Sequence, residues 1–337
     1  MDNEEATGQQ MSAVSVIIPV FNGESTIERA IRSAVNQSYP PARVIVIDDG
    51  STDQTLSAVE KMLDRHDNLR VISIDNGGVS NARNLGIERV KTEYILFLDA
   101  DDVLLPNAIE ILTKCMDHNV DVACGGYITG NIASMNDFPR TRDFDRVPRF
   151  IELSGEETLA TMLRSQLVSS SVWAKLYRRS SIGGIRFDKR LSFAEDLEFN
   201  ARILSNSHRV KITDQKVYFY AEEISSVTRQ PATVSSLQTF SVLHGLPHTT
   251  PALKRAVVSR EFVEAMQLST RLVSKDDRIS KFCTESLIRT ARPAARDRYL
   301  GFRWRLLGTL TRCFGADFGM FVFNISWTIS NATRRLR

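Results

Sequence analysis

Short apolar runs alternate with helical patterns along the first 124 residues. Between these runs, apolar residues recur at helical spacing, for example Ile27, Ala30, Ile31 and Ala34. The apolar, strand-like runs themselves occupy residues 14–18, 44–48, 69–74 and 94–99. Continuous apolar strands separated by single helices are typical of a parallel sheet covered on both faces. We therefore expect an α/β fold built on a mostly parallel sheet.

The alternation ends after residue 124. Residues 129–150 contain few apolar runs and many Asn, Asp, Pro and Arg residues, which indicates a mobile loop. Helices are expected near 155–164 and 194–205, a strand pair near 208–221, and a helical pattern from about 232 onward. We expect three parts, namely an N-terminal tail (1–11), an α/β domain (12–230) and a C-terminal helical region (231–337).

Polar residues follow each of the four expected strands. Ligands of open parallel sheets bind at the carboxyl ends of the strands, so these residues share one candidate site. Taken singly, each has a structural explanation, since Asp, Gly, Ser and Thr also form turns and helix caps. Neither GxGxxG nor the phosphate-binding P-loop pattern is present. The four segments are "PVFNGE" (19–24), "DDGSTD" (48–53), "DNGGVSNARN" (75–84) and "DADD" (99–102).

The "DADD" segment has more carboxylates than a helix cap needs. Clustered carboxylate oxygens suit Mg²⁺ or Mn²⁺, which fill their other positions with water and substrate phosphate. An apolar strand ending in Asp-x-Asp also fits haloacid-dehalogenase-type phosphatases, with Asp99 as nucleophile and Asp101 as acid/base. Those enzymes usually carry this motif on an early strand and a second acidic motif later. Here three βα units precede it and no such motif follows.

A second acidic pair, Glu195 and Asp196, begins the helix expected near 194–205. Carboxylates favour helix N-termini because of the backbone dipole. The same pair can supply a general base for a substrate hydroxyl. The local sequence does not separate these two explanations.

Five segments together resemble family 2 glycosyltransferases of the GT-A fold, a Rossmann-like nucleotide-diphospho-sugar transferase fold. The resemblance covers roughly residues 12–225, and the order and spacing of the segments make it specific. The segments are "VSVIIPVFNGESTIERAIRSAVNQSYPPARVIVIDDGSTDQT" (14–55), "NGGVSNARNLGI" (76–87), "YILFLDADD" (94–102), "SVWAKLYRR" (171–179) and "FAEDLEFNARIL" (193–204).

The resemblance implies a role for each matching residue. Asp101 corresponds to the metal ligand with Asp102 as its helper, and Asp196 to the catalytic base with Glu195 beside it. Where this chain has Phe21 the family often has Tyr, so a hydroxyl contact is lost while ring packing is kept. Nucleotide or donor contacts fall on Pro19, Phe21, Asn22, Asp49 (nucleobase), Arg83, Asp99 (ribose) and Lys175, the last within the "WxKL" segment that begins at Trp173.

The resemblance also implies an activity. It predicts an inverting, Mn²⁺- or Mg²⁺-dependent transfer of a sugar from a nucleotide-sugar donor, with a UDP-sugar favoured, to a hydroxyl of a glycan or lipid-linked acceptor. The expected setting is surface or exopolysaccharide biosynthesis. The non-enzymatic alternative is an inactive sugar-nucleotide-binding module.

Basic charge is concentrated at the C-terminus. The net charge is +3, yet residues 291–337 contain nine Arg, no Lys and two Asp, so the first 290 residues carry a balance of −4. Arginines interleaved with Phe and Trp predict peripheral contact with an anionic membrane surface. A helical subdomain or a homodimer contact is the alternative. The acidic balance upstream and the lack of a recognisable module argue against nucleic-acid binding.

The compartment is expected to be reducing. The segment "MDNEEATGQQM" is polar and lacks the apolar stretch of a secretory signal. Cysteines 115, 124, 283 and 313 show no CxxC spacing. The apolar segment 318–330 is shorter than the roughly 20 residues that span a bilayer. We expect a cytoplasmic protein, located at the inner face of the cell membrane if the basic tail binds there.

Overall fold

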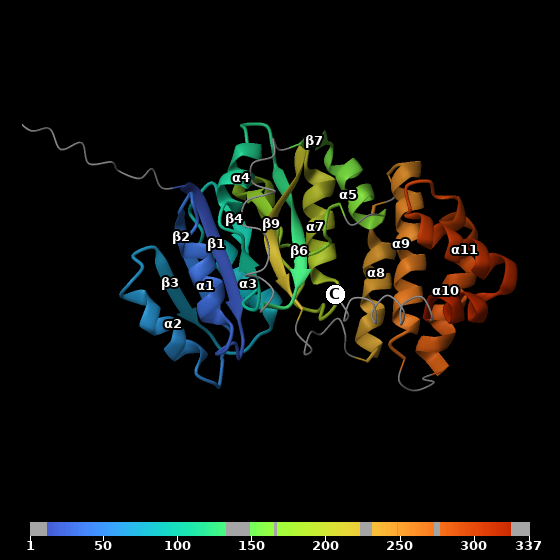
Figure 1. The fold of residues 1–337 in the computed structure, drawn as a ribbon, viewed down its shortest axis with the longest axis horizontal. Helices are drawn as coiled ribbons and strands as arrows, with labels where there is room; N and C mark the ends of the chain where they lie inside the picture. Colours follow the sequence, from blue (N-terminus) through green and yellow to red (C-terminus); the bar gives the residue numbers. More distant parts are fainter. Residues whose placement is uncertain are drawn as a thin grey trace, which may run out of the picture. The chain divides into compact units, whose positions relative to one another are not determined.

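The computed structural model describes residues 12–132, 149–164, 167–222, 231–247, 249–272 and 277–324 (Figure 1). The chain forms two compact units that interleave along the sequence. The first contains residues 1–152, 172–187 and 207–222, and the second contains residues 153–171, 188–206 and 223–337. Each unit is described separately below.

The sheet combines a parallel half with a mixed half. Its strand order is β3-β2-β1-β4-β8-β6-β9-β5, and β7 pairs with β9. The pairs among β1, β2, β3 and β4 are parallel, whereas β8 is antiparallel to both β4 and β6. The strands are β1 (Ser12–Val20), β2 (Pro41–Asp48), β3 (Leu69–Ser73), β4 (Tyr94–Phe97), β5 (Val103–Leu104), β6 (Val122–Gly130), β7 (Phe150–Leu153), β8 (Lys175–Arg178) and β9 (Val210–Ala221).

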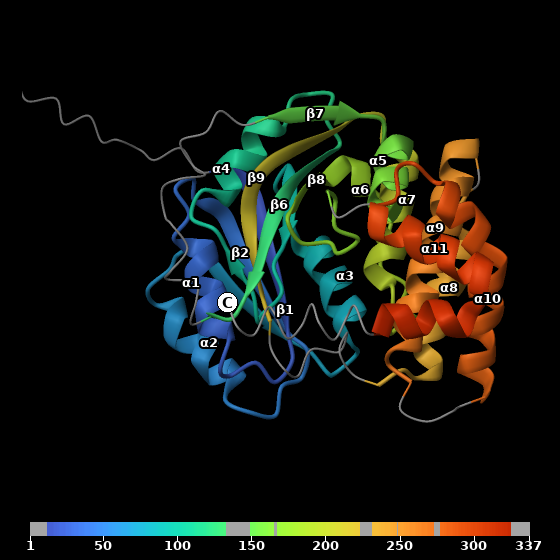
Figure 2. The ribbon, with the colours of Figure 1, turned by 45° about the vertical axis from the view of Figure 1, so that its right-hand side comes forward.

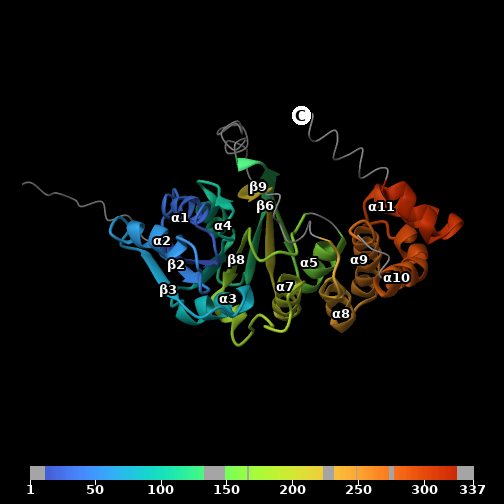
Figure 3. The same ribbon diagram turned by 90° about the horizontal axis from the view of Figure 1, so that it is seen from below.

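Helices cover both faces of the parallel half. Figure 3 shows α1 and α4 on one side of the sheet and α3 on the other. Val16 and Ile18 of β1 pack with Ile31 of α1, while Ile17 faces α3. A Cβ at Gly86 would lie 2.4 Å from Ile17, so only glycine allows α3 to approach this closely. The helices are α1 (Ile27–Val35), α2 (Thr55–Leu63), α3 (Val79–Arg89), α4 (Ala108–Cys115) and α6 (Arg179–Ile182).

The second unit is helical. Figure 2 shows α8, α9, α10 and α11 side by side, and α9 also contacts α5, which contacts α7. A buried ion pair joins Arg164 Nε to Asp297 Oδ2 at 2.7 Å, and Ser259 donates to the same oxygen. The elements are α5 (Gly155–Arg164), α7 (Glu195–Asn206), η3 (Val234–Leu237), α8 (Gln238–Gly245), α9 (Pro251–Ser269), α10 (Asp277–Arg296) and α11 (Phe302–Phe314).

The expected α/β fold is confirmed, with two differences in the sheet. The antiparallel strands β8 and β5 make the sheet mixed as a whole. The strand pair expected near 208–221 is wrong, because β9 is one continuous strand. Its polar centre suggested a turn, but the ladder shifts register opposite Gly126, and Asp214 accepts a 3.1 Å hydrogen bond from the backbone N–H of Arg149.

Several expectations fall outside the described residues. These are the tail 1–11, most of the loop expected at 129–150, and the last 13 residues of the basic tail. The helices expected at 155–164 and 194–205 correspond to α5 and α7. Among the described residues, no helix is long and apolar enough to cross a bilayer.

Candidate active site

The loops after β1 and β2 meet at the carboxyl edge of the sheet. Parallel pairing sets Val20 beside Asp48, so the residues that follow are neighbours. Asn22 has a left-handed backbone (φ 49°), and its Oδ1 accepts from the Thr52 N–H at 2.8 Å. The Asn22 carboxamide therefore joins the two loops. Phe21 is 51% exposed and offers a ring face, whereas Pro19 is buried within β1.

Asp49 joins the β2 end to the loop that precedes α3. It is 3% exposed, and its two carboxylate oxygens accept from the N–H groups of Gly77 (2.9 Å) and Gly78 (2.8 Å). An ionised carboxylate has about four acceptor positions, so these contacts leave capacity for a nucleobase donor. The observed hydrogen bonds hold Asp49 in a fixed orientation at this edge.

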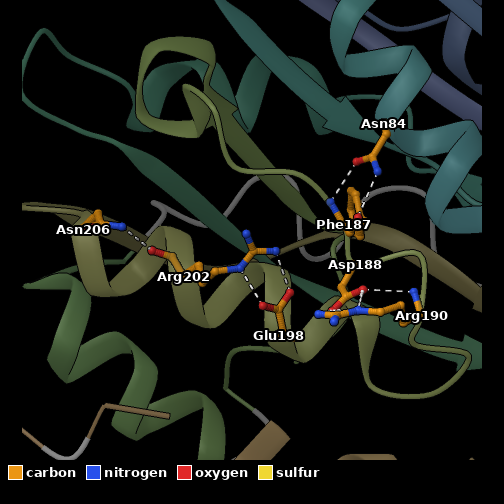
Figure 4. Close-up of polar contacts among 7 residues, drawn as sticks. All are labelled: Asn84, Phe187, Asp188, Arg190, Glu198, Arg202 and Asn206. Atoms are coloured by element: carbon orange, nitrogen blue, oxygen red, sulfur yellow. Dashed lines mark hydrogen bonds and ion pairs between the residues drawn. The ribbon is translucent and has the colours of Figure 1, made fainter. Parts of the chain in front are cut away.

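Arg83 of α3 pairs with Asp99 at the end of β4. Their Nη2 and Oδ1 atoms are 2.9 Å apart, and the side chains of Arg83 and Asp99 are 4% and 27% exposed. The guanidinium lies 5.3 Å from the ring centroid of Phe187. Asn84, next along α3, exchanges two hydrogen bonds with the Phe187 backbone, at 2.8 and 2.9 Å (Figure 4). Arg83 is thus held inside the unit, and Asp99 is the member of the pair that a ligand can reach.

Asp102 is enclosed by protein donors. It is fully buried, accepting from the Tyr218 hydroxyl at 2.7 Å and from the Ala221 N–H at 2.8 Å. Burial raises the pKa of Asp102 to about 8, and the carboxylates of Asp99 and Asp101 act in the same direction. These contacts fit a residue that holds the loop in place. They do not fit the expectation that Asp102 is a second metal ligand.

An aromatic cluster supports this loop from β9 and the segment before β8. Trp173 stacks on Tyr218 with ring centroids 4.7 Å apart and planes within 9°. Tyr220 stacks on the same indole, and Tyr127 meets it edge-on. Because Tyr218 also contacts the acidic loop, Trp173 has a packing role in fixing that loop.

Asp101 is the exposed carboxylate of the acidic loop. Its backbone carbonyl accepts a 2.7 Å hydrogen bond from Arg29 of α1, which fixes the main chain there. In the part of the chain that the structure describes, no group of three or more His, Cys, Asp or Glu residues could hold a metal ion. Mg²⁺ and Mn²⁺ commonly bind through one or two carboxylates and substrate phosphates. Asp101 fits such a site, completed by a diphosphate.

Lys175 begins β8 and is only 1% exposed. It pairs with Cys124 of β6 in the interior of the sheet. Burial raises the pKa of the Cys124 thiol to about 11, an effect that the positive charge of Lys175 opposes. A donor contact for Lys175 therefore stays a prediction.

The acidic pair of the second unit lies in the first turn of α7. Glu195 and Asp196 are half-buried and follow Ala194, whose φ of 62° turns the chain into the helix. Figure 4 shows two ion pairs nearby along the chain, Glu198 with Arg202 and Asp188 with Arg190. The half-buried position of Asp196 at a helix start is compatible with either explanation given by the sequence.

Gln238 is a site residue that the sequence did not indicate. Its Oε1 accepts from the Ser192 N–H (3.0 Å), the Ser192 hydroxyl (3.2 Å) and the Phe193 N–H (3.1 Å). Its Nε2 donates to the Arg190 carbonyl at 3.2 Å. One side chain of α8 therefore holds the loop that leads into the α7 acidic pair. No local motif marks Gln238, because its partners lie more than 40 positions away in the sequence.

This chain is similar in sequence to proteins of a known family. The model for Glycosyl transferase family 2 matches residues 15–185, just over half of the chain. The uncharacterized glycosyltransferase EpsJ of Bacillus subtilis is 32% identical over 221 residues, which cover 65% of this chain and 63% of EpsJ. The matched region is thus less than two thirds of that relative.

Two solved structures have the same fold. TarS 1–349 from Staphylococcus aureus, in complex with UDP-GlcNAc, has a TM-score of 0.60 and 21% identity, covering 94% of this chain and 91% of that chain. The mannosyltransferase PcManGT from Pyrobaculum calidifontis, in complex with GDP-Man and Mn²⁺, has a TM-score of 0.55 and 17% identity, covering 94% and 86%. The fold is therefore GT-A, and with the family match over residues 15–185 this chain belongs to glycosyltransferase family 2.

Proposed function

We propose that this protein is a metal-dependent, inverting glycosyltransferase. It moves a sugar from a nucleotide-diphosphate donor, with a UDP-sugar favoured, to a hydroxyl of a glycan or lipid-linked acceptor in surface or exopolysaccharide biosynthesis. The supporting observation is the carboxyl edge of the sheet, where the exposed Asp101 follows the Arg83–Asp99 pair. That edge lies within the family 2 match.

The donor nucleotide would contact the ends of β1, β2 and β4. The exposed ring of Phe21 offers a stacking surface for a base, and Asp49 offers acceptor oxygens to its N–H groups. Asp99 would accept from the ribose hydroxyls while its pair with Arg83 keeps it oriented. Binding at this edge would place the diphosphate beside Asp101.

Asp101 would hold a Mn²⁺ or Mg²⁺ ion together with the diphosphate. When bound, such an ion supplies positive charge that neutralises the leaving diphosphate. Asp102 stays behind the loop, where Tyr218 and the Ala221 N–H orient it. Within "DADD", Asp99 would then contact the ribose, Asp101 would bind the metal ion and Asp102 would position the loop.

Asp196 would act as the general base. A sugar hydroxyl is a weak nucleophile, and removal of its proton by a carboxylate increases its reactivity as it attacks the anomeric carbon. One base with in-line attack gives inversion, whereas a retaining hydrolase needs a second carboxylate as covalent nucleophile. Glu195, beside Asp196, would support acceptor binding.

The alternatives from the sequence are less well supported. In a phosphatase, Asp99 would be the nucleophile, but here it pairs with a buried arginine and lies within the family 2 match. An inactive sugar-nucleotide-binding module would bind donors without turnover. Measurement of transfer separates that module from the enzyme.

A thermal-shift screen of nucleotide sugars with and without Mn²⁺ tests the proposal. A true donor should raise the melting temperature in proportion to its affinity, and Mn²⁺ should increase the shift. Asp101→Ala should remove the Mn²⁺-dependent part. Asp196→Asn should keep the donor-induced shift and lose transfer. Transfer at the wild-type rate by Asp196→Asn would exclude Asp196 as the base.

We also propose that residues 291–337 contact the inner face of the cell membrane. Phe302, Phe314 and Phe321 are 73%, 65% and 60% exposed, and Arg303 and Arg312 are exposed among them. Exposed aromatic side chains with arginines suit an anionic bilayer surface. A homodimer through the same residues is the competing explanation, and vesicle flotation with light scattering separates the two.

A further inference from the structure

A pocket lies at the amino edge of the sheet, on the opposite side of the first unit from the strand ends described above. Its volume is about 580 Å³. We call it the basic pocket, because four of its nine lining residues are cations and none is acidic. It is lined by Ser15, Ala42, Arg43, Ile45, Arg70, Ile72, Arg89, Lys91 and Thr92.

Strand register explains why the cations gather there. Ser15 of β1 pairs with Arg43 of β2, and Ile45 of β2 pairs with Arg70 of β3. Paired residues of parallel strands project from the same face, so Arg43 and Arg70 share one side of the sheet with Ile45. On that side α3 ends at Arg89, and the chain runs on through Lys91 toward β4. The basic pocket is the part of this face beyond the end of α3.

The positive charge of the basic pocket is not balanced by protein carboxylates. In the described part of the chain, no ion pair involves any of its four cations. The acidic residues nearest to Arg89 and Lys91 in sequence are paired elsewhere, Glu88 with Arg186 and Glu93 with Arg178. Among the described residues, the Arg43 and Arg70 side chains donate only to backbone carbonyls, at 2.6–3.0 Å. The four cations therefore repel one another until an anion binds.

Helix capping explains only part of this arrangement. Cations near the C-terminus of a helix interact favourably with its dipole, which accounts for Arg89 and Lys91 after α3. Arg43 and Arg70 lie on strands, so the dipole gives no reason for them. Their exposed guanidinium groups on one face indicate a ligand.

We propose that the basic pocket binds a ligand carrying two or more phosphate groups. Guanidinium groups match phosphate oxygens in paired hydrogen bonds, and a lysine adds a further charge. Thr92 lines the pocket with its hydroxyl bonded to that of the buried Ser15 at 2.8 Å, and Ile45 and Ile72 provide an apolar floor. Two sources offer this chemistry, a soluble phosphate-rich molecule and the headgroups of anionic lipids.

The basic pocket is separate from the proposed donor site. Both lie in the first unit, but β2 runs from Arg43 to Asp48 between them, a distance of about 16 Å at 3.3 Å per residue. Donor and phosphate ligand can therefore bind at the same time. The inference goes beyond the proposed transfer reaction and does not depend on it.

Calorimetric titration of the full chain with inorganic pyrophosphate tests the soluble source. A chelator is present, so pyrophosphate cannot bind through a metal ion at the donor site. The double variant Arg43→Glu, Arg70→Glu should bind pyrophosphate at least about tenfold more weakly, because two attractive charges become repulsive. Higher salt should weaken the wild-type binding, since the site is exposed.

A matched control carries the same charge change outside the pocket. Lys61→Glu with Arg65→Glu alters two exposed cations on and just after α2. This variant should bind pyrophosphate within about twofold of the wild type, as expected for charges outside the site. Arg43→Gln with Arg70→Gln removes charge without reversing it, and its melting temperature shows whether the fold is kept. Both pocket variants should keep the Mn²⁺-dependent thermal shift with UDP, which reports the donor site.

Vesicles distinguish the second source. If vesicles containing phosphatidylglycerol bind the wild type and the control variant but lose the Arg43→Glu, Arg70→Glu protein, the ligand is a lipid headgroup. If pyrophosphate alone shows this dependence, the ligand is soluble. The proposal is overturned if folded pocket variants bind both probes as the wild type does, or if neither probe binds.

Discussion

The hydroxyl of Tyr218 donates a 2.7 Å hydrogen bond to the buried carboxylate of Asp102. The same hydroxyl accepts from the Asp99 N–H at 3.2 Å, and the ring stacks on Trp173. A single side chain of β9 therefore connects the acidic loop after β4 to the aromatic cluster behind it. The conformation of the acidic loop therefore depends on a residue that is 116 positions away from Asp102 in the sequence.

Tyr218→Phe should weaken metal-dependent donor binding and lower stability. The substitution keeps the ring and removes a buried hydroxyl with two partners, which typically costs about 1–3 kcal/mol. The acidic loop would lose its anchor while Trp173 keeps its stacking partner. Chemical denaturation measures the stability change, and the Mn²⁺-dependent thermal shift with UDP measures binding.

Tyr127→Phe is the matched control for this prediction. Tyr127 meets Trp173 edge-on in the same cluster, and no hydrogen bond of its hydroxyl is found among the described residues. Removal of the Tyr127 hydroxyl should change the free energy of unfolding by less than about 0.5 kcal/mol. Equal effects of the two substitutions would contradict the role assigned to the Tyr218 hydroxyl.

Gln238→Ala should reduce turnover more than donor binding. Gln238 holds the loop from Arg190 to Phe193 with four hydrogen bonds, just before the proposed base Asp196. Release of this loop would let the start of α7 move, and small displacements of a catalytic group can cost about 10²-fold in rate. Steady-state kinetics should show kcat falling while KM for the donor stays nearly constant.

Gln267 is a half-buried glutamine on α9, and Gln267→Ala is the control for loss of a carboxamide in the same unit. It should leave kcat unchanged. Gln238→Glu keeps the acceptor oxygens that receive three of the four hydrogen bonds, so it should restore part of the rate. A fall in kcat for Gln267→Ala, or none for Gln238→Ala, would argue against a positioning role.

The sequence predicted the fold, but it does not distinguish the environments of the individual candidate residues. Continuous apolar runs identified β1 to β4, because a strand that is buried on both faces is apolar along most of its length. The three aspartates of "DADD" look equivalent in sequence, yet Asp101 is exposed and Asp102 is fully buried. Burial there depends on β9, which no local pattern connects to this loop.

Long-range partners also explain what was missed. Asn22 stays a predicted nucleotide contact, and the hydrogen bond that its carboxamide accepts from Thr52, 30 positions away, is one that no local pattern indicates. The continuous strand β9 was expected as two, because its exposed polar centre resembles a turn until β6 is placed beside it. Side-chain roles and strand pairing of this kind are set by tertiary contacts, which local periodicity does not encode.

Asp297→Ala should strongly destabilise the second unit. Asp297 is almost completely buried and bonds both Arg164 and Ser259. Removing one partner leaves a buried guanidinium without its counter-charge, which typically costs about 3–5 kcal/mol. Asp317→Ala, an exposed aspartate in the same unit, should have little effect. Denaturant unfolding followed by circular dichroism measures both, and equal midpoints would contradict this assignment.

Phe302→Ser with Phe321→Ser should release the protein from vesicles that contain anionic lipid. The two rings are 73% and 60% exposed, and burying one phenylalanine ring in an apolar phase is worth about 1.5–3 kcal/mol. If both rings insert partly, the double variant should partition onto vesicles at least about tenfold more weakly than the wild type, since tenfold corresponds to about 1.4 kcal/mol. Flotation with phosphatidylglycerol vesicles measures it, and neutral vesicles should bind less because the arginines lose their partners.

Phe150→Ser is the control for surface apolarity, because Phe150 is 48% exposed on β7, away from the basic tail in the sequence. It should float as the wild type does. Light scattering decides between membrane and dimer, since a dimer contact predicts that the wild type doubles in mass and that Phe302→Ser with Phe321→Ser restores the monomer. A dimer that dissociates in this way, with no vesicle binding by the wild type, would assign these rings to a protein contact and contradict the membrane prediction.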